Sequence, residues 1–272
     1  MTKNLDREGL RSIIKNYDLF FIDLWGVVHN GIKLNKEAVD VLTKISEAKK
    51  EYILLTNAPR PKKNVEDFLE KMGLEQNKRK KVFTSGEAAL SFLKKKHLNQ
   101  IFYHIGPPRD FDLFIDFKKN KTESINKSDY LLCTGLYDNH DEDLNYYREL
   151  LINHISKRMI CTNPDLIVDR GSKREYCAGS IALVFEKLGG QVTYFGKPHP
   201  EVYTQSIETT QKKIIAIGDN LRTDVKGANN MNYDSLFITN GIHNKEFKKE
   251  GIENILKKYE VKIKYYQREL KW

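Results

Sequence analysis

The chain alternates short runs of consecutive apolar residues with longer stretches in which apolar residues recur every three or four positions. The first apolar run spans residues 19–22, and residues 36–50 follow it with apolar side chains at helical spacing. A continuous apolar run bounded by turn residues is typical of a strand buried in a parallel sheet, whereas the recurring pattern is typical of a helix packed on that sheet. The sequence therefore opens as strand, turn, helix, after a short leading helix predicted over residues 7–15.

The same alternation continues for most of the chain. Further strands are predicted at residues 52–55, 81–83, 191–195, 213–217 and 235–239, and further helices at residues 62–72, 84–97, 180–188, 200–209 and after 223. Residues 261–265 alternate lysines with apolar residues, which favours an edge strand whose lysines discourage further pairing. Strands that alternate with helices predict a doubly wound, Rossmann-like α/β core around a parallel sheet.

A second series of alternating strands and helices begins in the middle of the chain. Strands at 101–105, 130–133 and 159–161, with a helix over 141–154, predict a second and smaller α/β unit. We therefore expect a core domain made of residues 1–99 and 178–272, and an inserted cap domain at residues 100–177.

Composition and charge narrow the class of protein. The chain has 272 residues, of which 40% are hydrophobic and 31% are charged, and no apolar stretch approaches the roughly 20 residues that a bilayer requires. The net charge of +9 comes from lysines spread along the chain, without a recognised nucleic-acid-binding module. Three widely spaced cysteines form no Cys-x-x-Cys pair. We expect a cytoplasmic protein with reduced cysteines that binds neither nucleic acid nor membrane.

Candidate chemistry appears where four predicted strands end. Ligands and catalytic groups collect at the carboxyl ends of the strands in open α/β sheets, so these side chains are expected to share one pocket. Carboxylates there suit Mg²⁺, and hydroxyl, amide and ammonium groups suit phosphate oxygens. Each motif taken alone also fits an ordinary helix cap, turn or surface lysine. The residues are, in chain order, Asp23, Thr56 with Asn57, Lys197, and Asp219 with Asp224.

These motifs resemble those of the haloacid dehalogenase superfamily of aspartate-nucleophile hydrolases. The resemblance rests on Asp23, on Thr56, on Gly-Lys-Pro around Lys197, and on Gly-Asp-x-x-x-Thr-Asp at residues 218–224. The position of the insert, with Thr-Asn-Pro-Asp at residues 162–165, resembles the class IIA cap branch, which includes nitrophenyl-phosphatases and pyridoxal-phosphate or phosphoglycolate phosphatases. The resemblance covers nearly the whole chain.

The resemblance implies a role for each motif. Asp23 would attack phosphorus and form an aspartyl-phosphate. Asp23, Asp219 and the backbone carbonyl of Trp25 would bind Mg²⁺, with Asp224 supporting the metal or the lysine. Thr56, the backbone at Asn57, and Lys197 would hold the phosphoryl group. The candidate substrate contacts are His29, Tyr137, Asp138, Asn163, Asp165 and Arg170.

One residue departs from the family pattern. The phosphatases of the family carry a second aspartate two residues after the nucleophile, and this aspartate acts as a general acid and base. In this chain the corresponding residue is Trp25. Loss of such a group typically lowers the rate about 10² to 10⁴-fold, and less where the leaving group is a weak base. Three hypotheses remain open: a phosphatase that uses His29, a cap residue or an activated substrate; a dehalogenase; or a phosphate-binding protein with little turnover.

The expectation is therefore an Mg²⁺-dependent phosphohydrolase that acts on a small phosphorylated metabolite through Asp23. A catalytically weak binding or regulatory protein is the main alternative. The sequence leaves the substrate undecided, and a homodimer is compatible with it.

Overall fold

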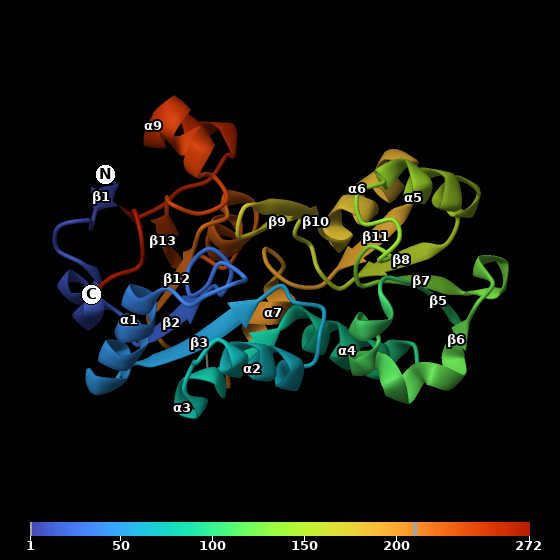
Figure 1. Ribbon diagram of the computed structural model, residues 1–272, viewed down its shortest axis with the longest axis horizontal. Coiled ribbons are helices and arrows are strands. Elements are labelled where there is room, and N and C mark those ends of the chain that lie inside the picture. Colours follow the sequence, from blue (N-terminus) through green and yellow to red (C-terminus); the bar gives the residue numbers. More distant parts are fainter. Residues whose placement is uncertain (1, 209–210) are drawn as a thin grey trace.

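A computed structural model describes residues 2–208 and 211–272 of the chain as two parallel sheets with helices (Figure 1). In Figure 1 the larger sheet lies on the left with both chain ends, and the smaller sheet lies on the right. The larger sheet has seven strands, all parallel. In spatial order they are β1 (Lys3–Asn4), β14 (Tyr265–Gln267), β13 (Asp234–Ile238), β12 (Ile214–Gly218), β2 (Leu19–Ile22), β3 (Glu51–Thr56) and β4 (Val82–Thr84).

Helices cover both faces of the larger sheet, so the predicted doubly wound α/β core is confirmed. One face packs against the apolar side of α1 through Ala38, Val41 and Leu42, and the other packs against Tyr203 and Ala228. Every residue of β2 and β12 is buried, which explains their continuous apolar sequences. The helices are α1 (Lys36–Glu47), α2 (Lys62–Lys71), α3 (Gln76–Arg79), α7 (Pro200–Thr204), α8 (Lys226–Asn230) and α9 (Asn244–Lys258), with a π-helical turn η7 (Leu221–Val225) before α8.

The smaller sheet has five parallel strands and forms the predicted second α/β unit. In spatial order the strands are β11 (Gln191–Tyr194), β8 (Arg158–Cys161), β7 (Tyr130–Cys133), β5 (Phe102–Ile105) and β6 (Lys121–Thr122). Three α-helices pack on it, α4 (Ser85–Lys96) on one face and α5 (Leu144–Leu151) and α6 (Ala178–Lys187) within a second apolar cluster. Short 3-10 segments connect the strands, namely η3 (Pro108–Asp110), η4 (Asp112–Asn120), η5 (Ile125–Lys127) and η6 (Ile152–His154).

This packing corrects the expected domain boundaries at residues 99 and 177. β11 pairs with β8, and α6 contributes Ile181 and Phe185 to the smaller unit's apolar cluster. Ala88 and Leu93 of α4 pack against the opposite face of the same sheet. The hydrophobic pattern predicted each of these elements, but the same pattern fits a helix or strand of either sheet.

The two ends of the chain also differ from the prediction. Residues 7–15 form two 3-10 turns, η1 (Leu10–Ser12) and η2 (Ile14–Asn16), because Leu10 donates its N–H to Lys271 O rather than to a helical partner. The last strand is β14, which begins at Tyr265 and lies between β1 and β13, so its prediction as an edge strand is wrong. Val261 and Ile263 pack in an apolar cluster with Ile255 of α9 instead.

A two-stranded hairpin was not predicted. β9 (Ile167–Arg170) and β10 (Lys173–Tyr176) pair antiparallel, and their half-buried or exposed charged residues gave no clear alternation. The helix predicted from Pro200 begins there as α7, while Thr209 lies outside the described residues. Within the described residues, no helix is long and apolar enough to cross a membrane.

Candidate active site

Three neighbouring strands of the larger sheet end at one edge and carry polar residues. β2 lies between β3 and β12, and all three run parallel. Asp23 follows β2, Thr56 ends β3 and Asp219 follows β12, and all three residues are buried. The predicted convergence of these residues at a carboxyl edge agrees with the observed strand order.

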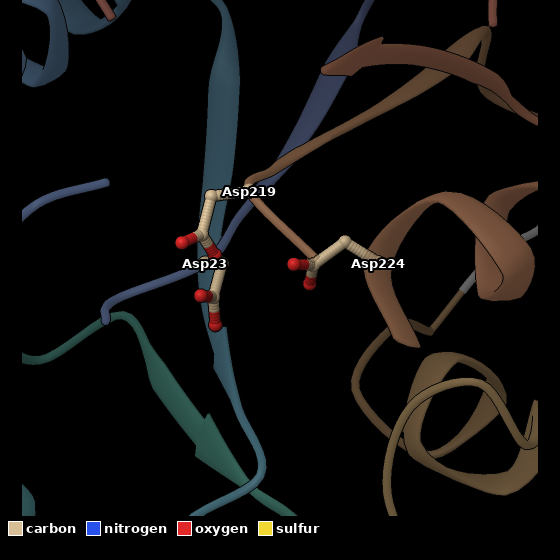
Figure 2. Close-up of side chains that lie close together, drawn as sticks. All are labelled: Asp23, Asp219 and Asp224. Carbon is tan, nitrogen blue, oxygen red and sulfur yellow. The ribbon is translucent and has the colours of Figure 1, made fainter. Parts of the chain in front are cut away.

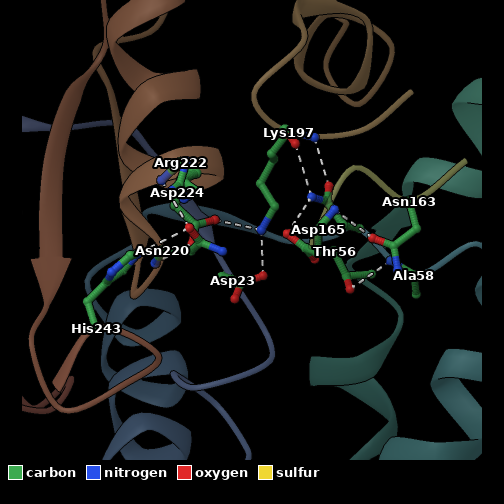
Figure 3. Close-up of polar contacts among 11 residues, drawn as sticks. Asp23, Thr56, Ala58, Asn163, Asp165, Lys197, Asn220, Arg222, Asp224 and His243 are labelled. Carbon is green, nitrogen blue, oxygen red and sulfur yellow. Dashed lines mark hydrogen bonds and ion pairs between the residues drawn. The ribbon is translucent and has the colours of Figure 1, made fainter. Parts of the chain in front are cut away.

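Lys197 reaches the same edge from the other sheet. It follows β11, so its expected place after a strand of the core sheet is wrong. Its Nζ atom donates to Asp23 Oδ1 at 2.5 Å and to Asp224 Oδ1 at 2.6 Å (Figure 3). The side chain is only 5% exposed, so the ammonium group joins two carboxylates with little screening by water.

The side chain of Asn57 fixes the position of Lys197. Its Oδ1 accepts the backbone N–H of Lys197 at 2.7 Å, and its Nδ2 donates to Lys197 O at 3.0 Å and to Asp165 Oδ1 at 3.1 Å. A Cβ on residue 196 would lie 2.6 Å from Asn57 Oδ1, and Gly196 has φ +113°, so only glycine fits this approach. Because the Asn57 amide is engaged here, only its backbone is left for a phosphoryl group.

Three buried carboxylates form a candidate cation site. Ligand oxygens of Asp23, Asp219 and Asp224 lie within 4.8 Å of one another, with Asp23 and Asp219 side by side in Figure 2. Asp219 Oδ2 accepts the backbone N–H of Ile242 at 2.7 Å, and within the described residues it has no lysine or arginine partner. A Cβ on Gly26 would lie 2.0 Å from Asp219 Oδ2, so the backbone that follows Asp23 passes directly beside this carboxylate.

The pKa shifts reflect this concentration of buried negative charge. Burial raises the pKa of Asp219 to about 8, with a further contribution from Asp224. Burial also raises the pKa of Asp23 well above its ordinary value, against the opposing effect of Lys197. Burial acts to lower the pKa of Lys197, but the neighbouring carboxylates of Asp224 and Asp23 more than offset it and raise the pKa overall.

A divalent cation fits these residues on physical grounds. Two or three carboxylates in one pocket suit a hard cation such as Mg²⁺. Lys197 supplies one positive charge, whereas Asp23, Asp219 and Asp224 carry three negative charges when ionised. A bound cation would reverse the cost of ionising Asp219, because its charge stabilises the carboxylate.

A cavity of about 690 Å³ extends from this cluster to the carboxyl ends of the smaller sheet. Tyr137 does not line it: the Tyr137 hydroxyl donates to His104 O at 3.1 Å, and the ring lines a separate cavity of about 400 Å³. All the other predicted site residues line the larger cavity: Asp23, Trp25, His29, Thr56, Asn57, Asp138, Asn163, Asp165, Arg170, Lys197, Asp219 and Asp224.

Aromatic groups surround Trp25 on the cavity wall. Its ring stacks on Phe68 with centroids 6.3 Å apart, and His29 meets it edge-on at 4.8 Å. The guanidinium of Arg170 lies 5.2 Å from the centre of the indole. His29 Nδ1 accepts the N–H of Gly31 at 3.0 Å, and burial, followed by the charge of Arg170, lowers the pKa of His29 to about 3. His29 is therefore a neutral imidazole at neutral pH.

Several residues that line the cavity were missed. Arg60 on the core side and Asp110 on the cap side form an ion pair at 2.7 Å, and Arg109 pairs with Asp138. Asp110 follows a predicted strand, so a polar residue at a strand end was an available signal. Phe68 lies on the apolar face of a predicted helix, so the pattern predicts a core residue. No neighbouring motif indicates that it lines a site.

Asn163 and Asp165 lie where the two units meet. Asn163 Oδ1 accepts the N–H of Asp165 at 3.1 Å, which fixes the turn after β8. Burial raises the pKa of Asp165 to about 6, against the effect of Lys197. Ser85 donates to Thr162 O at 2.6 Å and binds the same strand end to α4. The contact to the core is made by Asp165, whose Oδ1 accepts the Nδ2–H of Asn57, just after β3, at 3.1 Å.

Comparison with known proteins gives the same family along nearly the whole chain. Residues 20–116 match a profile described as haloacid dehalogenase-like hydrolase, and residues 194–259 match one described as HAD-hydrolase-like. A crystal structure of a haloacid dehalogenase-like hydrolase from Brucella suis is 31% identical, with a TM-score of 0.85 over 97% of this chain and 99% of that chain.

Two more distant relatives have named activities. The 5'-nucleotidase YutF of Bacillus subtilis is 23% identical over 88% of this chain and 94% of its own length. A p-nitrophenyl phosphatase from Archaeoglobus fulgidus is 18% identical, with a TM-score of 0.73 over 93% of this chain and 97% of that chain, and shares the fold. Together with the strand order and the convergence of the four motifs, these matches show that the chain belongs to the haloacid dehalogenase-like hydrolase family.

Proposed function

We propose that the protein is an Mg²⁺-dependent phosphohydrolase that acts on a small phosphorylated metabolite through an aspartyl-phosphate on Asp23. The observation that carries this proposal is the buried group of Lys197 between Asp23 and Asp224, beside an Asp219 that has no cation partner among the described residues. Relatives named as a 5'-nucleotidase and as an acid sugar phosphatase support a phosphoryl substrate.

The chain's own residues suit two successive displacements at phosphorus. An oxygen of Asp23 attacks the phosphoryl group while Lys197, held by Asp224, keeps positive charge beside it. Thr56 Oγ1 accepts the N–H of Ala58 at 3.2 Å, which leaves the hydroxyl hydrogen to donate to a phosphoryl oxygen. Water then attacks the aspartyl-phosphate and releases orthophosphate with the free carboxylate.

Mg²⁺ fits beside Asp23 and Asp219, with Asp224 close by. When bound, it would supply positive charge that offsets both the carboxylates and the phosphoryl oxygens. The backbone carbonyl of Trp25 is the further ligand that the family resemblance implies.

The test is phosphate release by the purified protein with Mg²⁺ from 4-nitrophenyl phosphate and from a panel of sugar phosphates and nucleotides. Asp23→Asn removes the nucleophile, and we expect it to lower kcat by at least about 10³-fold. Asp40→Asn is the matched control, because Asp40 is an exposed aspartate on α1.

Two outcomes would redirect the proposal. If the wild-type protein released no more phosphate than Asp23→Asn from any compound, the hydrolytic function would be rejected in favour of a phosphate-binding role. Release of halide from a 2-haloacid, without phosphate release, would support dehalogenation instead.

A further inference from the structure

The wall of the cavity around Trp25 is built from two segments that are far apart in the sequence. The hairpin of β9 and β10 contacts the loop after the nucleophile, where Gly171 donates its N–H to Asn30 O at 3.0 Å. This contact accompanies the placement of Arg170, whose guanidinium lies over the Trp25 ring. A positive charge therefore lies over the residue two positions after Asp23.

Arg170 has unused hydrogen-bonding capacity. Its Nε donates to Glu175 Oε2 at 3.2 Å, and within the described part of the chain neither Nη atom has a hydrogen-bond partner. A guanidinium with free Nη groups binds a carboxylate strongly and with defined geometry. Arg170 lines the same cavity as Asp23.

The groups in direct contact with the Trp25 ring are aromatic or cationic, and none of them is a carboxyl group. Trp25 carries only an indole N–H, and the Nδ1 atom of His29 is occupied, because it accepts the N–H of Gly31. Five further carboxylates that line the cavity each form an ion pair with a lysine or an arginine: Asp110, Asp138, Asp141, Asp169 and Glu175.

Asp165 is the remaining carboxyl group on the cap side. It accepts from Asn57, whose amide also holds the backbone of Lys197, so its contacts place it beside the phosphoryl-binding side of the site. Its contacts do not include Trp25 or Arg170. A leaving group at the Trp25 wall consequently meets a cation and an aromatic surface rather than an acid.

From these observations, and resting on the proposed phosphohydrolase function, we infer that the substrates are acyl phosphates and that Arg170 receives the departing carboxylate. An alkoxide must be protonated as it leaves, whereas a carboxylate is stable as an anion. The phosphoryl transfer then has a cation at each end, with Lys197 beside the attacking Asp23 and Arg170 beside the leaving carboxylate.

The chemistry balances without a proton donor. Asp23 forms a bond to phosphorus while the bond from phosphorus to the acyl oxygen breaks, and the electron pair leaves with the substrate carboxylate. Both this substrate and the aspartyl-phosphate are acyl phosphates, so the first transfer exchanges one bond for another of the same kind. Water then displaces Asp23, again as a carboxylate, and its proton stays on orthophosphate or passes to solvent.

The experiment compares kcat/KM for acetyl phosphate, 4-nitrophenyl phosphate and glycerol phosphate with Mg²⁺, after subtraction of the rate with Asp23→Asn. We expect acetyl phosphate to exceed glycerol phosphate by at least about 10²-fold, the size of a missing general acid. A glycerol phosphate value within tenfold of acetyl phosphate would overturn the inference while leaving the phosphohydrolase function intact. No turnover of any compound, acetyl phosphate included, would instead overturn the proposed function.

Substitutions on the hairpin test whether Arg170 is responsible for the preference for acetyl phosphate. Arg170→Gln is expected to lower kcat/KM for acetyl phosphate at least about tenfold, with partial rescue by Arg170→Lys. Arg174→Gln is the matched control, because Arg174 is on the same hairpin and pairs with Asp169. Equal losses in Arg170→Gln and Arg174→Gln would assign Arg170 a structural role only and overturn its part in the inference.

Two further variants, Trp25→Asp and Asp165→Asn, test whether the protein supplies a proton to the leaving group. Trp25→Asp places a carboxyl group at the wall, and we expect it to raise the ratio of the glycerol phosphate rate to the acetyl phosphate rate about 10²-fold. A selective loss of glycerol phosphate turnover in Asp165→Asn would identify Asp165 as a proton donor and contradict the inference. The wild-type substrate ratio needs no variant, so the inference remains testable if a variant fails to fold.

Discussion

The two parallel sheets direct their carboxyl ends into one cavity, but they present charge to it in opposite ways. At the larger sheet, Asp23 and Asp219 are buried and join a cluster with Lys197. At the smaller sheet, the ion pair of Arg109 and Asp138 has side chains that are 56% and 60% exposed. Both edges are polar, but the Asp23 and Asp219 carboxylates at the first are buried, whereas the Arg109–Asp138 pair at the second is exposed.

This difference in burial suggests different roles: the buried charges suit the chemical step, and the exposed charges suit contacts with the substrate. Buried charges interact strongly and stay in fixed positions, which suits stabilisation of charge that develops in a transition state. An exposed ion pair contributes about 0 to 1 kcal/mol and is screened by salt. We therefore expect changes at the larger sheet to affect turnover on every substrate, and changes at the exposed pairs to have small effects.

The largest effect is expected from Lys197→Met. It removes the cation between Asp23 and Asp224, and we expect kcat to fall at least about 10²-fold. Lys78→Met is the matched control, because the Lys78 side chain is also buried, at 7% exposed, but pairs with Glu75 away from the cavity. Steady-state kinetics of folded samples would check this, and equal kcat values for the two variants would refute the division of roles.

Removal of Mg²⁺ is expected to make the stability of the protein depend on the protonation of Asp219. With its pKa raised to about 8 by burial and then by Asp224, Asp219 keeps a proton in the folded protein that the unfolded chain releases above about pH 4. The stability of the metal-free protein should therefore fall as pH rises from about 4 to about 8. Mg²⁺ binds the ionised form, so its stabilising effect should grow over the same range.

Thermal unfolding at pH 5.5 and pH 8, with Mg²⁺ or with a chelator, measures this linkage. Saturation at 100 times Kd stabilises a protein by about 2.7 kcal/mol. We expect the Mg²⁺-dependent rise in Tm to be larger at pH 8 than at pH 5.5, and Asp219→Asn to remove most of that difference. An equal rise at both pH values in the wild-type protein would contradict the assignment of Asp219.

The smallest effects are expected at the smaller sheet, where two aspartates allow a matched test. The Asp110 side chain is 6% exposed and pairs with Arg60, whereas Asp138 is largely exposed. We expect Asp110→Asn to lower the free energy of unfolding by about 1 to 3 kcal/mol and Asp138→Asn by less than about 0.5 kcal/mol. Urea unfolding would measure both, and a larger loss in Asp138→Asn would break the link between burial and effect.

Much of the core could be predicted because its signals are local. The apolar runs of β2 and β12 end at Asp23 and Asp219, so strand and site appear in the same few residues. Where parallel strands are neighbours, their carboxyl ends meet at one edge. The resemblance to a known family could then be stated from four short motifs, and the family comparisons confirm it.

Other features depended on which surfaces pack together. Helical and strand periodicity predicted α6 and β11 but could not assign them to the smaller sheet, because both sheets bury elements with the same pattern. For the same reason Lys197 was expected after a strand of the core. Tyr137 lies at a strand end next to polar residues, but its hydroxyl bonds to His104 O and turns its ring away from the main cavity.

The sequence by itself determined the parallel α/β architecture, the polar residues at the strand ends that include Asp23 and Asp219, and the presence of Trp25 where the family pattern has an aspartate. Only the tertiary structure decided what takes that place: Phe68 and His29 from the core, and Arg170 from a hairpin that the pattern did not reveal. The physical reason is the distance along the chain over which each kind of information acts. Spacing along the chain encodes which face of an element is buried, whereas contacts between distant segments depend on how whole faces pack against one another.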